Sequence, residues 1–266
     1  MHFTRPENLP KLMVAPNGAR RTKQDHPAIP VTLEETFATA QKCYAAGAES
    51  IHFHLRDADQ QHLLDAGLYK EGLAELHRLL PEMHLQITTE AVGRYSPEEM
   101  TKIAYEVMPP GISIGLAELM PDRQPGAENI RLYKTLYEAG CRVQHLCYQL
   151  DDVDLLARLV EAADLAGEKI WAMFVIGHYT GRISHPDMIQ PFIDRAAANG
   201  LELDWAVCAF AEQEHTTLER AALLGGKVRV GFENSIFMPD GSIAPDNETR
   251  VKAATRLFDK KRMLDR

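Results

Sequence analysis

The sequence alternates eight times between a short run typical of a β-strand and a longer run with apolar residues at helical spacing. Eight such units predict parallel strands joined by crossover helices, because parallel neighbours need a long connection. A closed (β/α)8 TIM barrel accounts best for this count, and its usual length of about 250 residues suits a chain of 266. The expected strands cover residues 12–16, 50–56, 84–89, 111–115, 142–148, 169–176, 204–210 and 227–232.

The expected helices carry recognisable boundary residues. Thr32-Leu-Glu-Glu and Ser96-Pro-Glu-Glu are capping boxes, and apolar spacing predicts one helix over 154–166. Glycines a few residues before the next strand are expected to cap the preceding helices in the left-handed conformation. These are Gly47, Gly140, Gly167, Gly200 and Gly225.

An open, doubly wound sheet is the alternative architecture. It would favour a GxGxxG turn after the first strand, whereas residues 17–21 read Asn-Gly-Ala-Arg-Arg. The chain also lacks a linker, a low-complexity tract or a shift in composition between its halves. We therefore expect one barrel domain over residues 1–266.

Charge and hydropathy exclude several classes of partner. The formal charge of −9 provides no dominant basic surface for a phosphate backbone, so we expect no nucleic acid. The longest uncharged apolar run, 170–177, is far shorter than the ~20 residues that span a bilayer, and residues 1–12 do not resemble a signal peptide. Four scattered cysteines without a CxxC pair indicate reduced thiols. A cytoplasmic protein is predicted.

The second expected strand ends in a pattern typical of a metal site. Alternation places His52, His54 and Arg56 on one face of the strand. Two imidazoles at positions i and i+2 can reach one ion, either Zn²⁺ or another borderline divalent metal. A satisfied core histidine beside a loop histidine is the alternative, but active sites of these barrels lie at the carboxyl ends of the strands. We favour the metal.

The eighth expected strand offers a third ligand. Arg229, Gly231 and Glu233 share one face, and inward residues of even-numbered strands can meet at a similar height. Two histidines and one carboxylate leave a coordination position open, as catalytic zinc sites do. Gly231 is expected to remove a side chain beneath the site. The alternatives are a helix-capping or surface role for Glu233 and an ion pair in the barrel core for Arg229.

Polar residues at other strand ends predict the wall of a substrate site. Gln86, Thr88 and Glu90 alternate along the third strand, and Ser113 on the fourth points to the same rim. A structural hydrogen-bond network would give the same pattern. Arg20 and Arg21 after the first strand suit a carboxylate or phosphate, although exposed charge is their default role. Three other histidines are weaker candidates, placed in loops: His178, His185 and His215.

The order of these motifs resembles the β-keto acid cleavage enzymes. The resemblance rests on residues 17–19, 52–57, 86–90 and 229–233, and it extends over nearly the whole chain. It implies a (β/α)8 barrel that condenses a β-keto acid with acetyl-CoA and releases acetoacetate and a new acyl-CoA. It also implies a homo-oligomer, with a tetramer favoured.

Site roles follow from the same resemblance. It implies one Zn²⁺ held by His52, His54 and Glu233, with Arg229 as a catalytic cation. Substrate contacts are expected from Arg20, Thr88, Glu90 and Ser113. Asn234 occupies a catalytic position where relatives carry aspartate, and asparagine cannot take up a proton. The resemblance also leads us to expect a glutamate at the end of the fifth strand, which residues 144–148 lack. The loop 211–215 is more acidic than is usual in this family.

Two other functions stay open at this point. An amidohydrolase-type hydrolase also uses an HxH pair in a barrel, but there the pair lies on the first strand and the last strand ends in aspartate. A catalytically inactive metal-binding barrel is the second alternative, because Asn234 replaces the aspartate.

Overall fold

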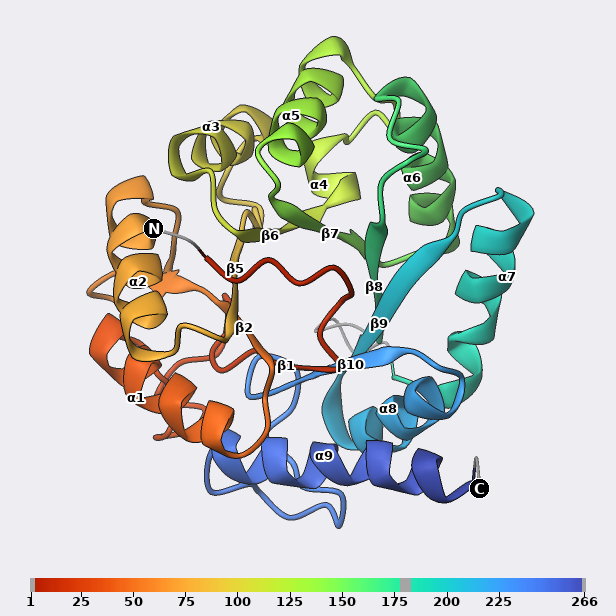
Figure 1. Cartoon of the computed structure of the whole chain (residues 1–266). Helices are drawn as coiled ribbons and strands as arrows, with labels where there is room; N and C mark the ends of the chain where they lie inside the picture. The colour runs from red at the N-terminus through yellow and green to blue at the C-terminus, as the bar shows by residue number, and fades with distance from the viewer. Residues whose placement is uncertain (1–2, 178–182, 265–266) are drawn as a thin grey trace.

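The eight-stranded barrel predicted from the sequence is confirmed. The computed structural model describes residues 3–177 and 183–264. Eight parallel strands close in the order β1-β10-β9-β8-β7-β6-β5-β2 (Figure 1). They are β1 (Leu12–Val14), β2 (Ser50–Phe53), β5 (His84–Thr88), β6 (Gly111–Gly115), β7 (Arg142–Cys147), β8 (Ile170–Ile176), β9 (Leu203–Ala209) and β10 (Lys227–Val230).

A ring of helices surrounds the strands (Figure 1). The α-helices are α1 (Leu33–Ala45), α2 (Ala66–Leu79), α3 (Pro97–Val107), α4 (Leu116–Leu119), α5 (Ala127–Glu138), α6 (Leu150–Ala162), α7 (Gln190–Ala198), α8 (Glu214–Leu223) and α9 (Asn247–Leu264). Two short 3₁₀ segments precede α7 and α8: η1 (Pro186–Met188) and η2 (Ala211–Gln213). No helix in the described ranges is both long and apolar enough to cross a bilayer.

Most of the predicted helix boundaries hold, and α6 is the exception. The capping boxes at Thr32 and Ser96 both form. The helix predicted over 154–166 instead covers Leu150–Ala162. It begins earlier because the Asp152 carboxylate accepts hydrogen bonds from the backbone N–H groups of Tyr148 and Gln149 at 2.7 and 2.9 Å.

The glycine caps are confirmed at four of the five predicted positions. Gly47, Gly140, Gly200 and Gly225 all have positive φ. Gly167 does not, because α6 ends earlier and Asp164 takes the left-handed conformation with φ 55°. The prediction for Gly167 was wrong for the same reason as the boundaries of α6.

The second predicted strand, 50–56, is divided. β2 ends at Phe53, and β3 (Leu55–Arg56) leaves the barrel to form an antiparallel hairpin with β4 (His62–Leu63). The Asn17 side chain causes the break at His54, because it accepts from His54 N at 3.2 Å and donates to His54 O at 2.9 Å. Both backbone groups of His54 are thereby satisfied without a neighbouring strand.

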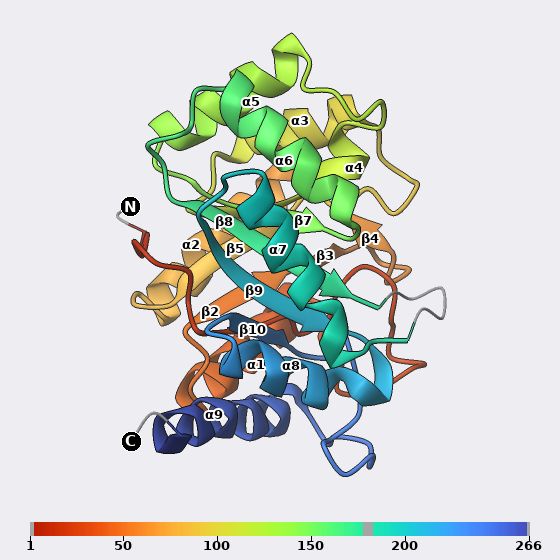
Figure 2. The ribbon, with the colours of Figure 1, turned by 90° about the vertical axis from the view of Figure 1, so that its right-hand side faces the viewer.

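Apolar side chains form separate layers outside and inside the barrel wall. The outer layer packs strands against helices, as where Phe174 stacks on Phe192 of α7 at 5.0 Å. The inner cluster includes Trp171, Met173 and Cys208, alternating with the outward residues. Leu9 joins this inner cluster, because the segment before β1 crosses one end of the barrel (Figure 1). Figure 2 shows both chain ends at that end of the barrel.

Candidate metal centre and active site

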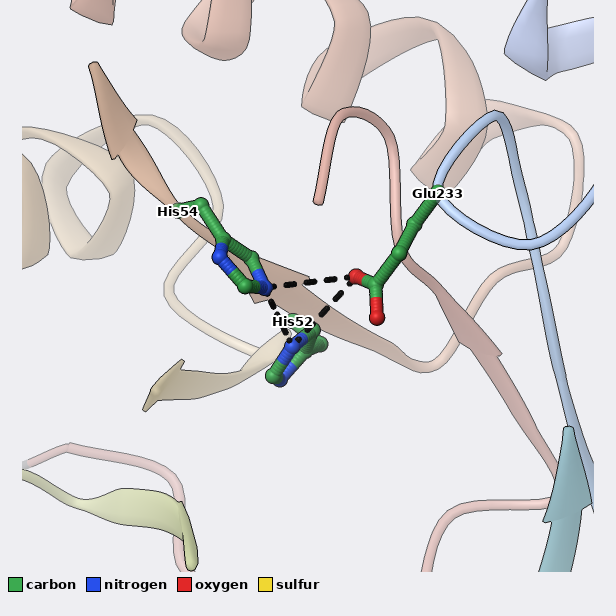
Figure 3. A group of neighbouring side chains, drawn as sticks. All are labelled: His52, His54 and Glu233. Carbon is green, nitrogen blue, oxygen red and sulfur yellow. Dashed lines mark hydrogen bonds and ion pairs between the residues drawn. The ribbon is translucent and has the colours of Figure 1, made fainter. Parts of the chain in front are cut away.

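Three of the predicted site residues converge at the barrel mouth. His52 lies on β2, His54 directly follows that strand, and Glu233 lies in the turn after β10. All three are buried, with exposed fractions of 1%, 2% and 5%. Their side chains point toward one another from opposite sides of a small space (Figure 3).

The distances between their donor atoms suit one metal ion. His52 Nε2 and His54 Nε2 are 3.0 Å apart, and each lies 3.4 Å from Glu233 Oε2. In a tetrahedral site with bonds of about 2.0–2.1 Å, ligand atoms lie about 3.3–3.4 Å apart. The three side chains therefore fit the metal that the motif predicted, with two nitrogen donors and one oxygen donor.

Glu233 reaches this position because a glycine and an arginine accommodate it. A Cβ on Gly18 would lie 2.4 Å from Glu233 Cγ, and Gly18 has φ +64°, so only glycine fits. Arg21 Nη1 donates to the carbonyl oxygens of Phe232 and Glu233 at 2.6 and 2.8 Å. Arg21 thus fixes the turn that carries Glu233. Arg21 therefore has a structural role beyond the exposed charge expected by default.

Gly231 has a different role from the one predicted. Its Cβ would lie 2.2 Å from the carbonyl oxygen of Ala15 on the neighbouring chain segment, and its φ is +138°. The glycine therefore permits close approach of the turn after β10 to the backbone after β1. It makes no room beneath the metal centre.

Burial and hydrogen bonding prepare the imidazoles as ligands. Burial lowers the pKa of His52 and of His54 well below the usual value, so both rings are neutral and can offer a lone pair. His52 Nδ1 lies 2.8 Å from Gln86 Oε1, and Gln86 Nε2 donates to Gln144 Oε1 at 3.1 Å. A glutamine oxygen can only accept, so it fixes the proton on His52 Nδ1 and leaves Nε2 for the metal.

The predicted cation Arg229 stands beside the carboxylate. Its Nη2 donates to Glu233 Oε1 at 2.8 Å and contacts Cys208 Sγ at 3.4 Å, and the arginine is 3% exposed. Arg229 therefore forms an ion pair in the barrel core and at the same time lies beside the predicted metal ligand Glu233. Glu233 offers Oε1 to Arg229 and Oε2 to the two histidines.

The hydroxyl groups expected at the rim lie together. Thr88 and Ser113 are register partners on β5 and β6, and their oxygens are 3.4 Å apart. Thr88 Oγ1 also accepts from Glu90 N at 3.0 Å. The two hydroxyls are buried, which agrees with a shared polar wall.

Glu90 lies in an environment that resists ionisation. Burial raises its pKa to about 8, and the carboxylates of Glu233 and Glu118 add to the effect, while Arg20 and Arg229 oppose it. Its Oε2 is 3.8 Å from His54 Nδ1. Arg20 is exposed and lies close enough to influence both Glu90 and Glu118, so the mouth carries mixed charge.

Asn234 follows Glu233 but is held away from solvent. It is fully buried, and within the described ranges neither polar atom of its side-chain amide has a hydrogen-bond partner. Its carbonyl oxygen accepts from Arg21 Nη2 at 3.5 Å. None of the contacts described for Asn234 involves His52 or His54 directly.

Other predicted residues are placed outside the cluster. The Arg56 guanidinium donates to the carbonyl oxygens of Gln60, Asn17 and Arg21, so it ties the β1 turn to the hairpin. Of the weaker histidines, His178 lies outside the described residues and His185 is exposed beside Asp187. His215 lies within α8, not in a loop.

The acidic segment 211–215 contributes less to the rim than its composition suggests. Glu214 begins α8, is buried, and forms an ion pair with Arg250 of α9. Glu212 is exposed. One carboxylate of this segment is therefore structural.

Three contributors to the site were not predicted. They are Asn17, which positions His54, Glu118, whose Oε1 accepts from Ala91 N at 3.2 Å, and His62, whose Nδ1 lies 3.4 Å from His54 Nδ1. The sequence could have indicated Asn17 as a site residue, because it precedes Gly18 in the turn after the first strand. The sequence could not have indicated His62, because nothing in its spacing shows that the β3–β4 hairpin folds back onto the end of β2.

The chain resembles known proteins in both sequence and fold. A family model described as beta-keto acid cleavage enzyme matches residues 11–262. The chain is 26% identical to a 3-keto-5-aminohexanoate cleavage enzyme of Fusobacterium nucleatum subsp. nucleatum, over 90% of this chain and 88% of the relative. It is 22% identical to a 3,5-dioxohexanoate:acetyl-CoA acetone transferase of Paraburkholderia graminis, over 92% and 88%.

The fold is shared with solved barrels. The binary complex of ObcA with oxaloacetate matches with a TM-score of 0.71 at 14% identity, over 90% of this chain and 67% of that one. A type I 3-dehydroquinate dehydratase from Clostridium difficile matches with a TM-score of 0.58, also at 14% identity, over 95% and 94%. These similarities support the barrel architecture.

Proposed function

Because this chain belongs to the β-keto acid cleavage enzyme family, we propose that it is a zinc-dependent enzyme that condenses a β-keto acid with acetyl-CoA. The products are acetoacetate and a new acyl-CoA. Relatives whose names include acetyl-CoA as a substrate support the choice of co-substrate. The observation that carries the proposal is the cluster of His52, His54 and Glu233, with donor atoms 3.0–3.4 Å apart.

Zinc is the metal proposed because the donors are two neutral imidazoles and one carboxylate, a borderline set. Bound there, it would act as a Lewis acid that polarises the keto group of the substrate and acidifies the adjacent carbon. The chain itself supplies the remaining functions through side chains around the cluster.

Arg229 is proposed as the cation that stabilises negative charge on the reacting oxygen. It is buried within 2.8 Å of Glu233, so it acts where water cannot screen its charge. Thr88 and Ser113 are proposed to donate hydrogen bonds to the substrate carboxylate. Asn234 can offer hydrogen bonds but cannot accept a proton, so its catalytic role is limited to orienting a group.

The substrate class follows from the charges at the rim. We propose that the end of the keto acid remote from the reacting carbons is neutral or anionic, because Arg20 is exposed at the mouth. Glu90 is the nearby carboxyl, and its raised pKa favours the neutral form. Both residues are proposed to contact substrate.

The decisive experiment is a panel of β-keto acids with ammonium, alkyl and carboxylate tails, incubated with acetyl-CoA and zinc-loaded protein. Acetoacetate should form only when both substrates are present, and the ammonium tail should be the poorest. Preference for the ammonium tail would overturn the proposed substrate class. Hydrolysis of lactones or amides without CoA would favour a hydrolase, and tight zinc binding without any turnover would favour an inactive barrel.

We further propose a cytoplasmic homo-oligomer, with a tetramer favoured. The four buried free cysteines agree with a reducing compartment. Light scattering coupled to gel filtration tests the assembly, and a monomer at micromolar concentration would contradict it.

A further inference from the structure

We propose that His62 is a positioning residue for the metal centre. It holds the His54 ring in the one tautomer that can bind a metal through Nε2. This inference rests on the metal site of the proposed function. It does not depend on the identity of the keto acid. It concerns a residue outside the three donors.

The β3–β4 hairpin brings His62 to His54. Arg56 and His62 are register partners in this hairpin. Arg94 Nη1 donates to the carbonyl oxygen of His62 at 2.9 Å, and the His62 side chain is buried, with the residue 2% exposed. The backbone that carries the ring is therefore held in place by contacts that do not involve the metal donors.

A metal ligand must present a nitrogen without a hydrogen. His54 Nε2 is the atom that faces His52 Nε2 at 3.0 Å and Glu233 Oε2 at 3.4 Å, so the hydrogen must reside on His54 Nδ1. That N–H needs an acceptor, because it is buried. The Glu90 carboxylate, 3.8 Å away, lies beyond hydrogen-bond range.

His62 supplies that acceptor. Its Nε2 lies 2.9 Å from the carbonyl oxygen of Glu90, which can only accept, so the hydrogen of His62 is on Nε2. Its Nδ1 then carries a lone pair, 3.4 Å from His54 Nδ1. The relay runs from His54 Nδ1–H to His62 Nδ1, and from His62 Nε2–H to the Glu90 carbonyl oxygen.

The other imidazole has an equivalent arrangement built from different residues. His52 Nδ1 is held by Gln86 Oε1 at 2.8 Å, and Gln86 is itself held by Gln144. Each histidine of the pair thus has its own buried acceptor, and both Nε2 atoms face Glu233. Partners of this kind commonly change metal affinity by about 10–100-fold when they are removed.

Two substitutions of equal size test the proposal. His62→Leu removes the acceptor, whereas His62→Asn retains an oxygen near the position of Nδ1. Zinc affinity is measured by competition with a chelator. We expect His62→Leu to weaken zinc binding by about 10–100-fold and His62→Asn to weaken it by less than about tenfold.

A spectroscopic measurement separates positioning from packing. Long-range ¹H–¹⁵N NMR on the zinc-free protein should show His54 as the Nδ1–H tautomer in the wild type and in His62→Asn. His62→Leu should show a mixture of tautomers. His145→Leu is the matched control, since His145 is also buried and hydrogen-bonded, with Nδ1 2.7 Å from the Trp171 carbonyl oxygen. This control should lose thermal stability but keep its zinc affinity.

Each outcome decides the matter. Wild-type zinc affinity in His62→Leu, equal loss in both His62 variants, or an unchanged His54 tautomer in His62→Leu would overturn the proposal. Failure of the wild type to bind zinc would also overturn it. Absence of acetoacetate formation in a protein that binds zinc would count against the proposed function alone.

Discussion

The interior of the barrel is polar along one arc of its wall and apolar along the opposite arc. Strands β10, β2, β5 and β6 contribute Arg229, His52, Gln86 and Ser113. Strands β7, β8 and β9 contribute the inner apolar cluster of Leu146, Trp171, Met173, Val175, Ala206 and Cys208. β7 belongs to both arcs, because its buried Gln144 accepts a hydrogen bond from Gln86. The two arcs meet where Arg229 contacts Cys208 and where His84 packs edge-on against Trp171.

The polar and apolar arcs serve different tasks: one holds the residues of the site, and the other stabilises the fold around it. Buried polar groups of the polar arc hold each other by hydrogen bonds, as Gln86 does for His52, and this arrangement contributes little net stability. The apolar arc stabilises the barrel by removing hydrocarbon surface from water. Substitutions in the two arcs should therefore affect different measurements.

The largest expected effect comes from Glu233→Gln in the polar arc. A neutral amide is a poor ligand, and loss of the carboxylate also removes the partner of Arg229, so zinc affinity and acetoacetate formation should fall by at least about 100-fold. Competition with a chelator measures the zinc affinity, and acetoacetate formed from a β-keto acid and acetyl-CoA measures the activity. Glu138→Gln, on the exposed face of α5, is the control and should behave like the wild type. Full zinc content and activity in Glu233→Gln would dismiss the metal centre.

Met173→Ala tests the apolar arc. Met173 is fully buried, so the cavity should lower the free energy of unfolding by about 2–5 kcal/mol. Zinc stoichiometry should stay unchanged. Urea unfolding measures the stability, with Leu223→Ala as a control because Leu223 is 37% exposed. If Met173→Ala lost zinc at unchanged stability, the division between the arcs would be wrong.

His84, at the junction of the arcs, should make stability depend on pH. Burial lowers its pKa to about 4 in the folded protein, against about 6.5 in the unfolded chain. The folded state thus binds the proton less well, and stability present above pH 6.5 is lost as the pH falls toward 4. The shift corresponds to about 3 kcal/mol.

The test for His84 is the pH dependence of urea unfolding. His84→Gln should reduce the slope between pH 6.5 and 4 by about one proton, although it lowers the stability at pH 7. His185→Gln, at an exposed histidine, serves as the control variant. An identical slope in wild type and His84→Gln would refute the assignment.

The smallest expected effect concerns Asn234→Asp. A carboxylate at this buried position could take up the proton that the asparagine cannot, so turnover should rise severalfold or its pH dependence should shift. Zinc content should change little, because Asn234 is not among the three donors. A strong loss of zinc in Asn234→Asp, with no gain in turnover, would show that the position serves only to pack the turn.

The sequence was informative where period-two alternation holds. His52, Gln86, Thr88 and Ser113 all lie on the predicted strands, and Glu233 was placed correctly because barrel strands end at one level. Alternation cannot describe a chain that leaves the sheet. The hairpin after His54 and the turn after Val230 therefore escaped prediction, and with them His62 and the role of Gly231.

The three donors also lie across the seam where the barrel closes. β1 pairs with β2 on one side and with β10 on the other, so the histidines and Glu233 come from opposite ends of the chain. Leu9, which packs against the inner apolar cluster, donates its backbone N–H to the carboxylate of Asp204, 195 residues away. Such distant contacts carry a high entropic cost of loop closure, which slows their formation during folding. An ion that binds only the closed barrel would stabilise the closed seam and slow its opening. The concentration of free metal would then set how long a molecule stays closed before the barrel opens.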